Sequence, residues 1–122
     1  LNQVDYINTH GTSTIIGDLA EVKAIQDLFA EHAYNISLTS SKSMTGHVLG
    51  ATGAIEAIIS VLSMKHSMVT PTINHEKGDE DPNIDYKLNF TFNQAQPREI
   101  NYAMSNNFGF GGHNACLLFK RI

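Results

Sequence analysis

The segment Gly50-Ala51-Thr52-Gly53-Ala54-Ile55-Glu56-Ala57-Ile58-Ile59-Ser60-Val61-Leu62-Ser63-Met64-Lys65 decides the fold class of this sequence. Its spacing predicts one helix from about Gly50 to Lys65, with apolar residues on almost every face. A helix that is apolar all round is normally buried between other layers of structure. Gly46, Gly50 and Gly53 near its start allow another backbone to approach closely. The segment therefore predicts a central helix that needs covering layers on both sides.

The segments around this helix predict alternating strands and helices. We expect strands at residues 4–7 and 36–39, polar loops at 10–17 and 40–47, and a helix at 18–32 that Asp18 and Glu21 open with a D-x-x-E capping signal. Further strands are expected within 69–73 and 85–92, and more clearly at 100–105 and 115–121, joined by a glycine-rich turn at 108–112. This order is that of an α/β fold with a layered sheet. A chain of 122 residues is too short to supply both covering layers, so we expect half of a larger molecule.

Composition excludes several classes of protein. Hydrophobic residues make up 42% and charged residues 16%, which is typical of a globular domain and not of a disordered chain. A net charge of −4 argues against an extended nucleic-acid surface. Glu56 interrupts the best apolar run, so no membrane span is expected. The single cysteine excludes a disulfide framework and a cysteine-rich zinc site, and fits the cytoplasm. Because the chain does not begin with methionine, we expect sequence upstream of Leu1.

Two histidines occupy matching positions, each between a predicted strand and a predicted helix. His10 lies in Thr9-His10-Gly11-Thr12-Ser13-Thr14, and His47 lies in Ser43-Met44-Thr45-Gly46-His47. Ligands of α/β sheets bind at this edge, so a shared site is as good an interpretation as two structural histidines. Neither has the spacing of a metal ligand. His47 precedes a helix N-terminus, which disfavours the imidazolium form and suits a neutral donor to a developing oxyanion or enolate.

Other candidate residues allow more than one interpretation. Lys42 lies in a loop, where lysines are usually solvated, but Glu56 on a buried helix needs a partner, and Lys42 or a bound cation could serve. The Phe108–Gly112 turn is either a mobile gate or a tight hairpin. We expect Cys116 to be buried in a strand and inert, so it is rejected as a nucleophile. His32, His66 and His75 are expected to be solvated, and His113 stays unassigned.

Three motifs, in this order, resemble those of the β-ketoacyl-acyl carrier protein synthases, above all the type II condensing enzyme of bacterial fatty acid synthesis. They are Asn8-Thr9-His10-Gly11-Thr12-Ser13-Thr14-x-x-Gly17-Asp18-x-x-Glu21, Ser41-Lys42-Ser43-Met44-Thr45-Gly46-His47-x-x-Gly50-Ala51 and Asn106-Asn107-Phe108-Gly109-Phe110-Gly111-Gly112-x-Asn114. The resemblance runs from about Val4 to Ile122. It implies the thiolase fold, in which two similar α/β halves pack into five layers. Residues 1–122 would form the C-terminal half, a mixed sheet with a buried central helix, and the nucleophilic cysteine would lie in the absent N-terminal half.

The resemblance also implies a reaction and its residues. The reaction is a decarboxylative Claisen condensation of malonyl-acyl carrier protein with an acyl-enzyme thioester. His10, His47 and Lys42 would be catalytic, with Glu56 supporting Lys42. Thr12 and Thr14 would bind the phosphopantetheine arm, and Phe108 with Gly109 would form the gate and oxyanion hole. Asn8, Glu56, Ser105 and Asn106 match a structural monovalent cation site; no other metal or cofactor is implied.

The implied partners are acyl carrier protein, the N-terminal half and a second copy in a homodimer, with no nucleic acid and no membrane. The chain by itself should be inactive. Two departures from the family pattern are Ile15-Ile16, where proline and a small residue are common, and His113, where threonine is common. Alternative functions are a polyketide-type ketosynthase, a non-catalytic chain-length factor and a free-standing carrier-binding module. The serine in Gly11-Thr12-Ser13-Thr14 favours fatty acid synthesis over polyketide synthesis. The chain retains His10, His47 and Lys42, which disfavours a non-catalytic chain-length factor. Its negative charge disfavours a free-standing carrier-binding module, because carrier proteins are themselves acidic.

Overall fold

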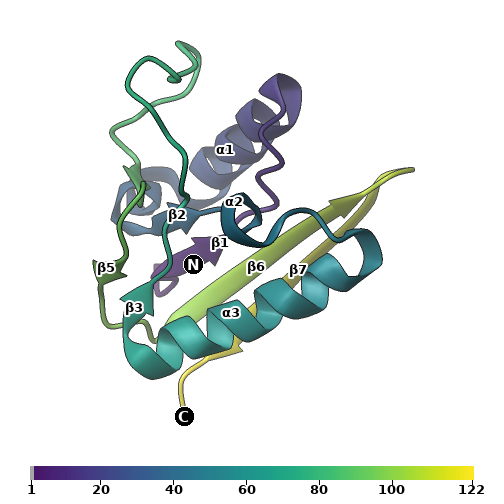
Figure 1. Ribbon diagram of the computed structural model, residues 1–122. Coiled ribbons are helices and arrows are strands. Elements are labelled where there is room, and N and C mark those ends of the chain that lie inside the picture. Colours follow the sequence, from purple (N-terminus) through teal and green to yellow (C-terminus); the bar gives the residue numbers. More distant parts are fainter. Residues whose placement is uncertain (1) are drawn as a thin grey trace.

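A five-stranded mixed sheet is the framework of the chain. The structure is a computed structural model that describes residues 2–122, so Leu1 lies outside the described residues. The strand order is β4-β2-β1-β6-β7, in which β7 alone runs antiparallel to its neighbour (Figure 1). The strands are β1 (Tyr6–Asn8), β2 (Ser37–Thr39), β4 (Asn89–Phe90), β6 (Tyr102–Gly109) and β7 (His113–Lys120). A separate two-stranded ribbon pairs β3 (Met68–Val69) with β5 (Gln96–Pro97).

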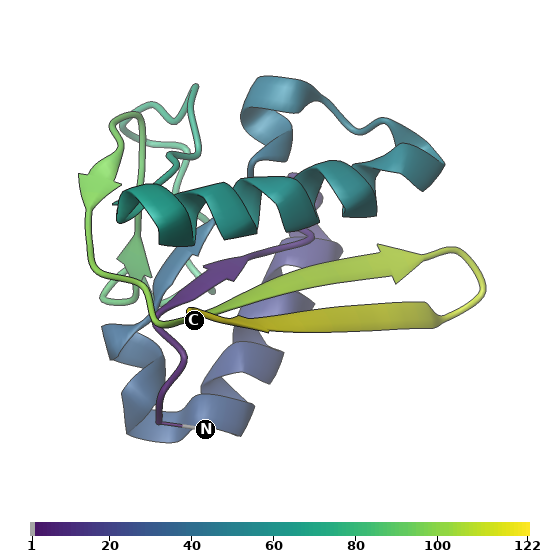
Figure 2. The same ribbon diagram turned by 90° about the horizontal axis from the view of Figure 1, so that it is seen from below.

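The two long helices lie on opposite faces of the sheet, which makes three layers (Figure 2). Helix α1 (Ile15–Phe29) continues into a 3₁₀ helix, η1 (Ala30–Asn35), and crosses from β1 to β2. A short helix α2 (Lys42–Thr45) and a 3₁₀ turn η2 (Leu49–Ala51) lead into α3 (Thr52–His66), which packs mainly along β6. The mixed α/β layout expected from the sequence is therefore confirmed.

Each face of the sheet has its own apolar core. Val22, Ile25 and Phe29 of α1 pack with Ile7 and Leu38 on one face. On the other face, Met64 of α3 packs with a smaller set of residues, namely Tyr6, Val69, Ile100 and Ala103, with Phe119 at its margin. Because strand side chains alternate between faces, Tyr6 and Asn8 of β1 lie under α3, whereas Ile7 lies under α1.

Helix α3 buries its polar side and exposes its apolar side. The buried residues are Thr52, Glu56, Ser60, Ser63 and Met64. By contrast, Ile58 is 60% exposed and Leu62 is 46% exposed. Nothing in residues 2–122 covers the outer face of this helix, as expected of a chain too short to supply both covering layers. An outer face of this composition matches a helix that is central in a larger layered molecule.

Several predicted boundaries are wrong. Helix α1 begins at Ile15, not Asp18, and ends at Phe29, and the predicted capping box does not form. Thr14 is the N-cap residue and makes no side-chain capping bond. The carboxylate of Glu21 instead accepts hydrogen bonds from the backbone N–H groups of His10 and Gly11, outside its own helix. The polar loop expected at residues 40–47 contains α2, and the sequence does not predict β5.

The β6–β7 hairpin is longer and more exposed than the sequence predicts. Phe108 belongs to β6, and β7 begins at His113, so only a short glycine-rich turn separates the strands. Nearly all of β7 is exposed, including Cys116, which contradicts the expectation that this cysteine is buried. Partial burial and, to a smaller extent, the charge of Glu21 raise the pKa of the Cys116 thiol, which makes it a poor nucleophile. Its rejection as a nucleophile therefore rests on this partial desolvation and not on complete burial in the core.

Candidate active site

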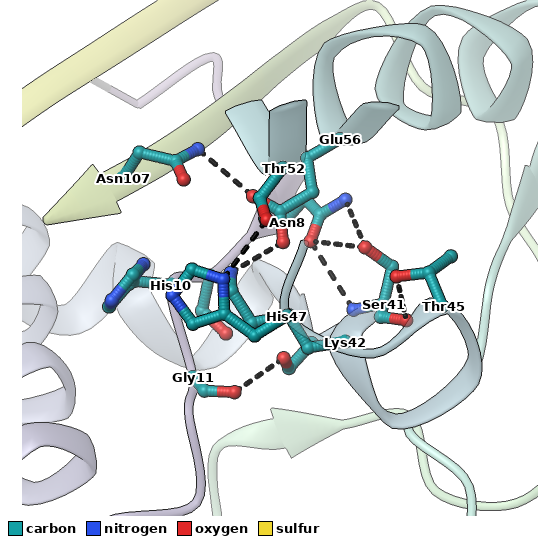
Figure 3. A network of polar contacts seen from close by, with 12 residues as sticks. Asn8, His10, Gly11, Ser41, Lys42, Thr45, His47, Thr52, Glu56 and Asn107 are labelled. Carbon is teal, nitrogen blue, oxygen red and sulfur yellow. Dashed lines mark hydrogen bonds and ion pairs between the residues drawn. The ribbon is translucent and has the colours of Figure 1, made fainter. Parts of the chain in front are cut away.

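The two motif histidines meet at one edge of the sheet. His10 follows β1, and His47 follows β2 and α2, so the parallel strands deliver both loops to the carboxyl edge. The ring centroids lie 5.6 Å apart with the ring planes nearly perpendicular, at 88°. Figure 3 shows the two rings facing one another beside the first turns of α3. The predicted convergence of His10 and His47 is therefore observed.

A buried carboxylate fixes the backbone that carries His10. The two oxygens of Glu21 accept hydrogen bonds from His10 N at 2.9 Å and Gly11 N at 3.0 Å, and Asn106 Nδ2 donates to the same carboxylate at 3.1 Å. Burial raises the pKa of Glu21, and these three hydrogen bonds act in the opposite direction. Glu21 therefore ties the His10 loop to both α1 and β6. Gly11 has a φ of +36°, and a Cβ there would lie 2.7 Å from Ser40 Cβ, so only glycine fits this turn.

The surroundings of the His10 ring disfavour its protonated form. Desolvation, followed by the charges of Lys42 and His47, lowers the pKa of His10 below its ordinary value. Its Nδ1 is buried and has no hydrogen-bond partner within residues 2–122. The ring lies 5.4 Å from the ring of Phe108, centroid to centroid. A neutral, partly unpartnered imidazole at this place can donate to or accept from a bound ligand.

Hydrogen bonds select the tautomer of His47. The backbone N–H of Leu49 donates to His47 Nδ1 at 3.2 Å, so this nitrogen is the acceptor. The Thr52 hydroxyl lies 3.0 Å from the same nitrogen. A neutral imidazole that accepts at Nδ1 carries its proton at Nε2. His47 therefore presents an Nε2–H donor, as its position ahead of α3 predicts.

Lys42 and Glu56 form a buried ion pair. Lys42 Nζ lies 2.5 Å from Glu56 Oε1, and the side chains are 5% and 0% exposed. The second oxygen, Glu56 Oε2, accepts a hydrogen bond from Asn107 Nδ2 at 2.9 Å (Figure 3). The expected pairing of Lys42 with Glu56 is confirmed, and the alternative of a solvated Lys42 is wrong. Asn107 is not among the residues that the sequence predicts for the site.

A groove of about 670 Å³ opens beside these residues. We call it the site groove. Its walls include Thr12, Ser13, Lys42, His47, Phe90 and Phe92, whereas His10 and Phe108 are not among its lining residues. The Thr12 and Thr14 hydroxyls lie 3.3 Å apart at an exposed position, and only Thr12 contributes to the wall. His75 is half-buried and stacks on Phe92 with 3.9 Å between ring centroids, so it is not the solvated residue expected. His32 is also half-buried, with Nε2 2.9 Å from the carbonyl oxygen of Val4, whereas His66 is exposed as expected.

The four residues matched to a cation site do not share one face of the sheet. Asn8 of β1 is the register partner of Ser105 of β6, and both lie on the side of α3, as does Glu56. The side chain of Asn106 lies on the opposite side, where it donates to Glu21 of α1. The structure therefore brings Asn8, Ser105 and Glu56 to one side and separates the Asn106 side chain from them. No cluster of three His, Cys, Asp or Glu residues that could hold a metal occurs within residues 2–122.

Three residues that complete the geometry are missed or misinterpreted from sequence alone. The sequence predicts Glu21 as part of a helix cap, although its place in the motif with His10 is a usable signal. Thr52 gives no signal of its own. Asn107 lies in the third motif, but its partner depends on which segments pack against the start of α3. Gly109 ends β6 directly after Phe108, so both predicted gate residues lie at the base of the hairpin turn.

Comparison with known families identifies the class of protein that this fold and site belong to. Residues 1–76 match the model of the family described as "Beta-ketoacyl synthase, C-terminal domain". The chain belongs to the β-ketoacyl synthase family, as its three motifs predict.

Curated relatives narrow the family. The chain is 55% identical over 119 residues to 3-oxoacyl-[acyl-carrier-protein] synthase 2 of Staphylococcus aureus (strain COL). It is 48% identical over 120 residues to the protein of the same name from Coxiella burnetii. Each match covers 98% of this chain but only 28% of the relative, so most of each relative lies outside the matched segment.

Solved structures confirm the thiolase-like ketosynthase fold. A β-ketoacyl synthase from Burkholderia phymatum superposes with a TM-score of 0.88 at 40% identity, covering 99% of this chain and 28% of the other. A type II polyketide ketosynthase, solved in complex with its acyl-carrier protein and bound to a hexaketide, superposes with a TM-score of 0.91 at 35% identity, covering 99% of this chain and 29% of the other. Within residues 2–122, none of the helices has the length and apolar character needed to cross a membrane.

Proposed function

We propose that this chain is the C-terminal part of a β-ketoacyl-acyl carrier protein synthase that elongates fatty acids by decarboxylative Claisen condensation. The observation that carries the proposal is the pair of imidazoles, His10 and His47, whose ring centroids lie 5.6 Å apart at the carboxyl edge of the sheet. Two such donors suit one thioester oxygen on which enolate charge develops. The buried Lys42 beside them supplies positive charge without needing to lose a proton.

The first chemical step is decarboxylation of the malonyl thioester. The bond between the carboxylate carbon and the α-carbon breaks, CO2 leaves, and the electron pair delocalises onto the thioester oxygen as an enolate. His47 donates its Nε2–H to this oxygen, and His10 donates from its own ring. The pKa of His10 is lowered and His47 Nδ1 accepts the Leu49 N–H, so both rings would stabilise the charge by hydrogen bonding without transferring a proton.

The second step forms the carbon–carbon bond. The α-carbon attacks the carbonyl of an acyl chain held as a thioester on a cysteine outside this chain. The tetrahedral intermediate collapses, the carbon–sulfur bond breaks, and the thiolate leaves with the electron pair. The backbone N–H of Phe108, next to Gly109, would stabilise the oxyanion of that intermediate, and the Phe108 ring beside His10 would gate the acyl channel.

The partners follow from the same proposal. Acyl carrier protein would deliver the malonyl group on a phosphopantetheine arm that Thr12 and Thr14 bind near the mouth of the site groove. The remaining polypeptide of the synthase, with the nucleophilic cysteine, would cover the apolar outer face of α3, where Ile58 and Leu62 are exposed. We propose that the complete enzyme is a cytoplasmic homodimer that binds neither nucleic acid nor a membrane.

A structural monovalent cation is proposed with a narrower set of ligands than the motifs imply. The buried Ser105 Oγ has no hydrogen-bond partner within the described residues, and it faces the same side as Asn8 and Glu56. These three residues fit an oxygen-coordinated ion, whereas the Asn106 side chain could not reach it from the opposite face. Such an ion would be structural and would stabilise the carboxyl ends of β1 and β6. No step of the reaction passes through it, and no other cofactor is proposed.

The decisive experiment measures the malonyl half-reaction in the complete synthase. His10→Ala or His47→Ala should each slow release of CO2 from malonyl-acyl carrier protein by on the order of 10²–10³, the usual scale for one oxyanion donor. His66→Ala is the matched control, because His66 is exposed at the end of α3 and lies in neither loop. Unchanged decarboxylation in both site variants would refute the proposal.

A polyketide-type ketosynthase is the second candidate. It is favoured by the structural likeness to the type II polyketide ketosynthase bound to a hexaketide. The two candidates use the same residues of this chain, and they differ in the product. Supplying a ketoreductase-free system with malonyl-acyl carrier protein and analysing the acyl products by mass spectrometry separates them. One round of condensation on saturated primers supports the fatty acid synthase, and poly-β-keto chains support the polyketide enzyme.

A further inference from the structure

Asn107 connects the buried ion pair to the strand that carries the gate. Its Nδ2 donates to Glu56 Oε2 at 2.9 Å, while Lys42 engages Glu56 Oε1 at 2.5 Å. The fully buried carboxylate of Glu56 is therefore held from two sides, by a cation on α2 and by an amide on β6. Asn107 immediately precedes Phe108, so the amide is anchored one residue from the ring that contacts His10.

The helix leaves room for this amide at one position. A Cβ built on Gly53 would lie 3.4 Å from Asn107 Nδ2 and 3.6 Å from its Cγ. These are ordinary contact distances, so the first turn of α3 lies directly against the Asn107 amide at Gly53. Asn107 and Glu56 do not form part of the wall of the site groove. The Asn107 amide is committed to Glu56, so we place its effect on the site through Glu56 and the neighbouring Phe108.

We propose that Asn107 is a positioning residue that locks Glu56 between Lys42 and β6, and so fixes the gate strand relative to the catalytic loops. Glu56 lies one helical turn after Thr52, whose hydroxyl contacts His47. A single turn of α3 thus holds His47 through Thr52, Lys42 through Glu56, and the Phe108 strand through Asn107. Without the amide, Glu56 Oε2 would be a buried acceptor with no donor, which favours movement of the carboxylate away from β6. The kinetic part of this inference rests on the proposed function.

The first test compares Asn107→Leu with the wild type in the complete synthase. Leucine has nearly the shape of asparagine but no donor. We expect kcat for condensation to fall about 10- to 100-fold, because a displaced catalytic group costs rate on this scale. KM for malonyl-acyl carrier protein should stay within about twofold, since Asn107 does not line the site groove. Asn101→Leu is the control, an exposed asparagine just before β6, and it should leave both constants unchanged.

The second test restores the bond with its polarity reversed. Asn107→Asp places a second carboxylate against Glu56 and should lower kcat at least as much as the leucine variant. In the double variant Asn107→Asp/Glu56→Gln, the introduced glutamine amide can donate to the introduced aspartate while its carbonyl accepts from Lys42. We expect this double variant to recover at least about tenfold in kcat over Asn107→Asp. A double variant no faster than Asn107→Asp, or a leucine variant with wild-type kcat, would overturn the positioning role. A wild-type enzyme that forms no β-ketoacyl product would instead refute the proposed function.

Discussion

Removing Lys42 while keeping Glu56 should strongly destabilise the protein. In Lys42→Ala the Glu56 carboxylate, which is 0% exposed, loses the ammonium 2.5 Å away and keeps only the Asn107 amide. An uncompensated buried charge of this kind costs about 3–5 kcal/mol of unfolding free energy. Glu56→Gln removes the negative charge, so in the double variant Lys42→Ala/Glu56→Gln no buried carboxylate is left without a cation. The double variant should therefore be more stable than Lys42→Ala by about 2 kcal/mol.

The assay is urea and thermal unfolding of the wild type, both single variants and the double variant of the protein that contains this chain. Lys65→Ala is the matched control, because Lys65 is an exposed lysine on the same helix, and its effect should stay within about 0.5 kcal/mol. If the two single effects add to the double effect within about 0.5 kcal/mol, the two side chains are not coupled. That result would refute the electrostatic account of the pair.

The His10 turn, the Glu21 carboxylate and the outer face of α3 each allow a further test. Gly11→Ala should abolish activity or folding, because the alanine Cβ would lie 2.7 Å from both Ser40 Cβ and Thr9 Oγ1. Gly46→Ala is the control: Gly46 has a φ of +73° but no atom within 4 Å of a Cβ, so this change should cost only about 1 kcal/mol of unfolding free energy. Unfolding curves of the two variants check this. Burial raises the pKa of Glu21, so the folded state binds a proton on this carboxylate more tightly than the unfolded chain does. The free energy of unfolding of the wild type should therefore fall, relative to Glu21→Gln, as the pH rises from the pKa of Glu21 in the unfolded chain through its raised pKa in the folded state. Denaturation of both proteins at a series of pH values checks this, and a constant difference would contradict it. The 122-residue chain alone should form no β-ketoacyl product, and it should self-associate through the exposed Ile58 and Leu62. A product assay and sedimentation check these two expectations, and a monodisperse, active monomer would disprove them.

The sheet and its two major helices could be predicted from sequence because their patterns are local. Alternation in β1 and helical spacing in α1 and α3 depend on neighbouring residues alone. The predicted start of α1 is wrong because Asp18 and Glu21 fit a capping signal, but a tertiary contact of Glu21 with the His10 loop overrides it. Strand β5 has two residues, too few for a pattern to show, and β3 covers only the start of the strand expected within 69–73.

Much of the candidate site could also be predicted, because two matching loops identify their histidines. His10 and His47 meet as expected, and Lys42 pairs with Glu56 as expected. The Asn107–Glu56 bond could not be predicted, since it joins residues 51 positions apart through the packing of α3 on β6. The face that Asn106 occupies depends on strand register, which its motif does not encode. The exposure of Cys116 could not be predicted, because it depends on what packs against β7, whereas the exposed outer side of α3 follows from the expectation of a half-molecule.

Helix α3 has a polar side that contacts the buried ion pair and an apolar side that is exposed in this chain, so the position of one side fixes the position of the other. Glu56 and Ile58 are two residues apart, yet one faces the ion pair and the other faces away from the sheet. A helix rises about 1.5 Å per residue. Because the helix moves as one unit, a contact that shifts Ile58 along the helix axis also shifts Glu56. A segment that packed against Ile58 and slid the helix by one residue step would carry Glu56 out of hydrogen-bonding distance of Lys42. The geometry of the Lys42–Glu56 ion pair therefore depends on how the rest of the molecule packs against α3. A neighbouring segment that packed incorrectly would lower the activity without contacting any catalytic residue.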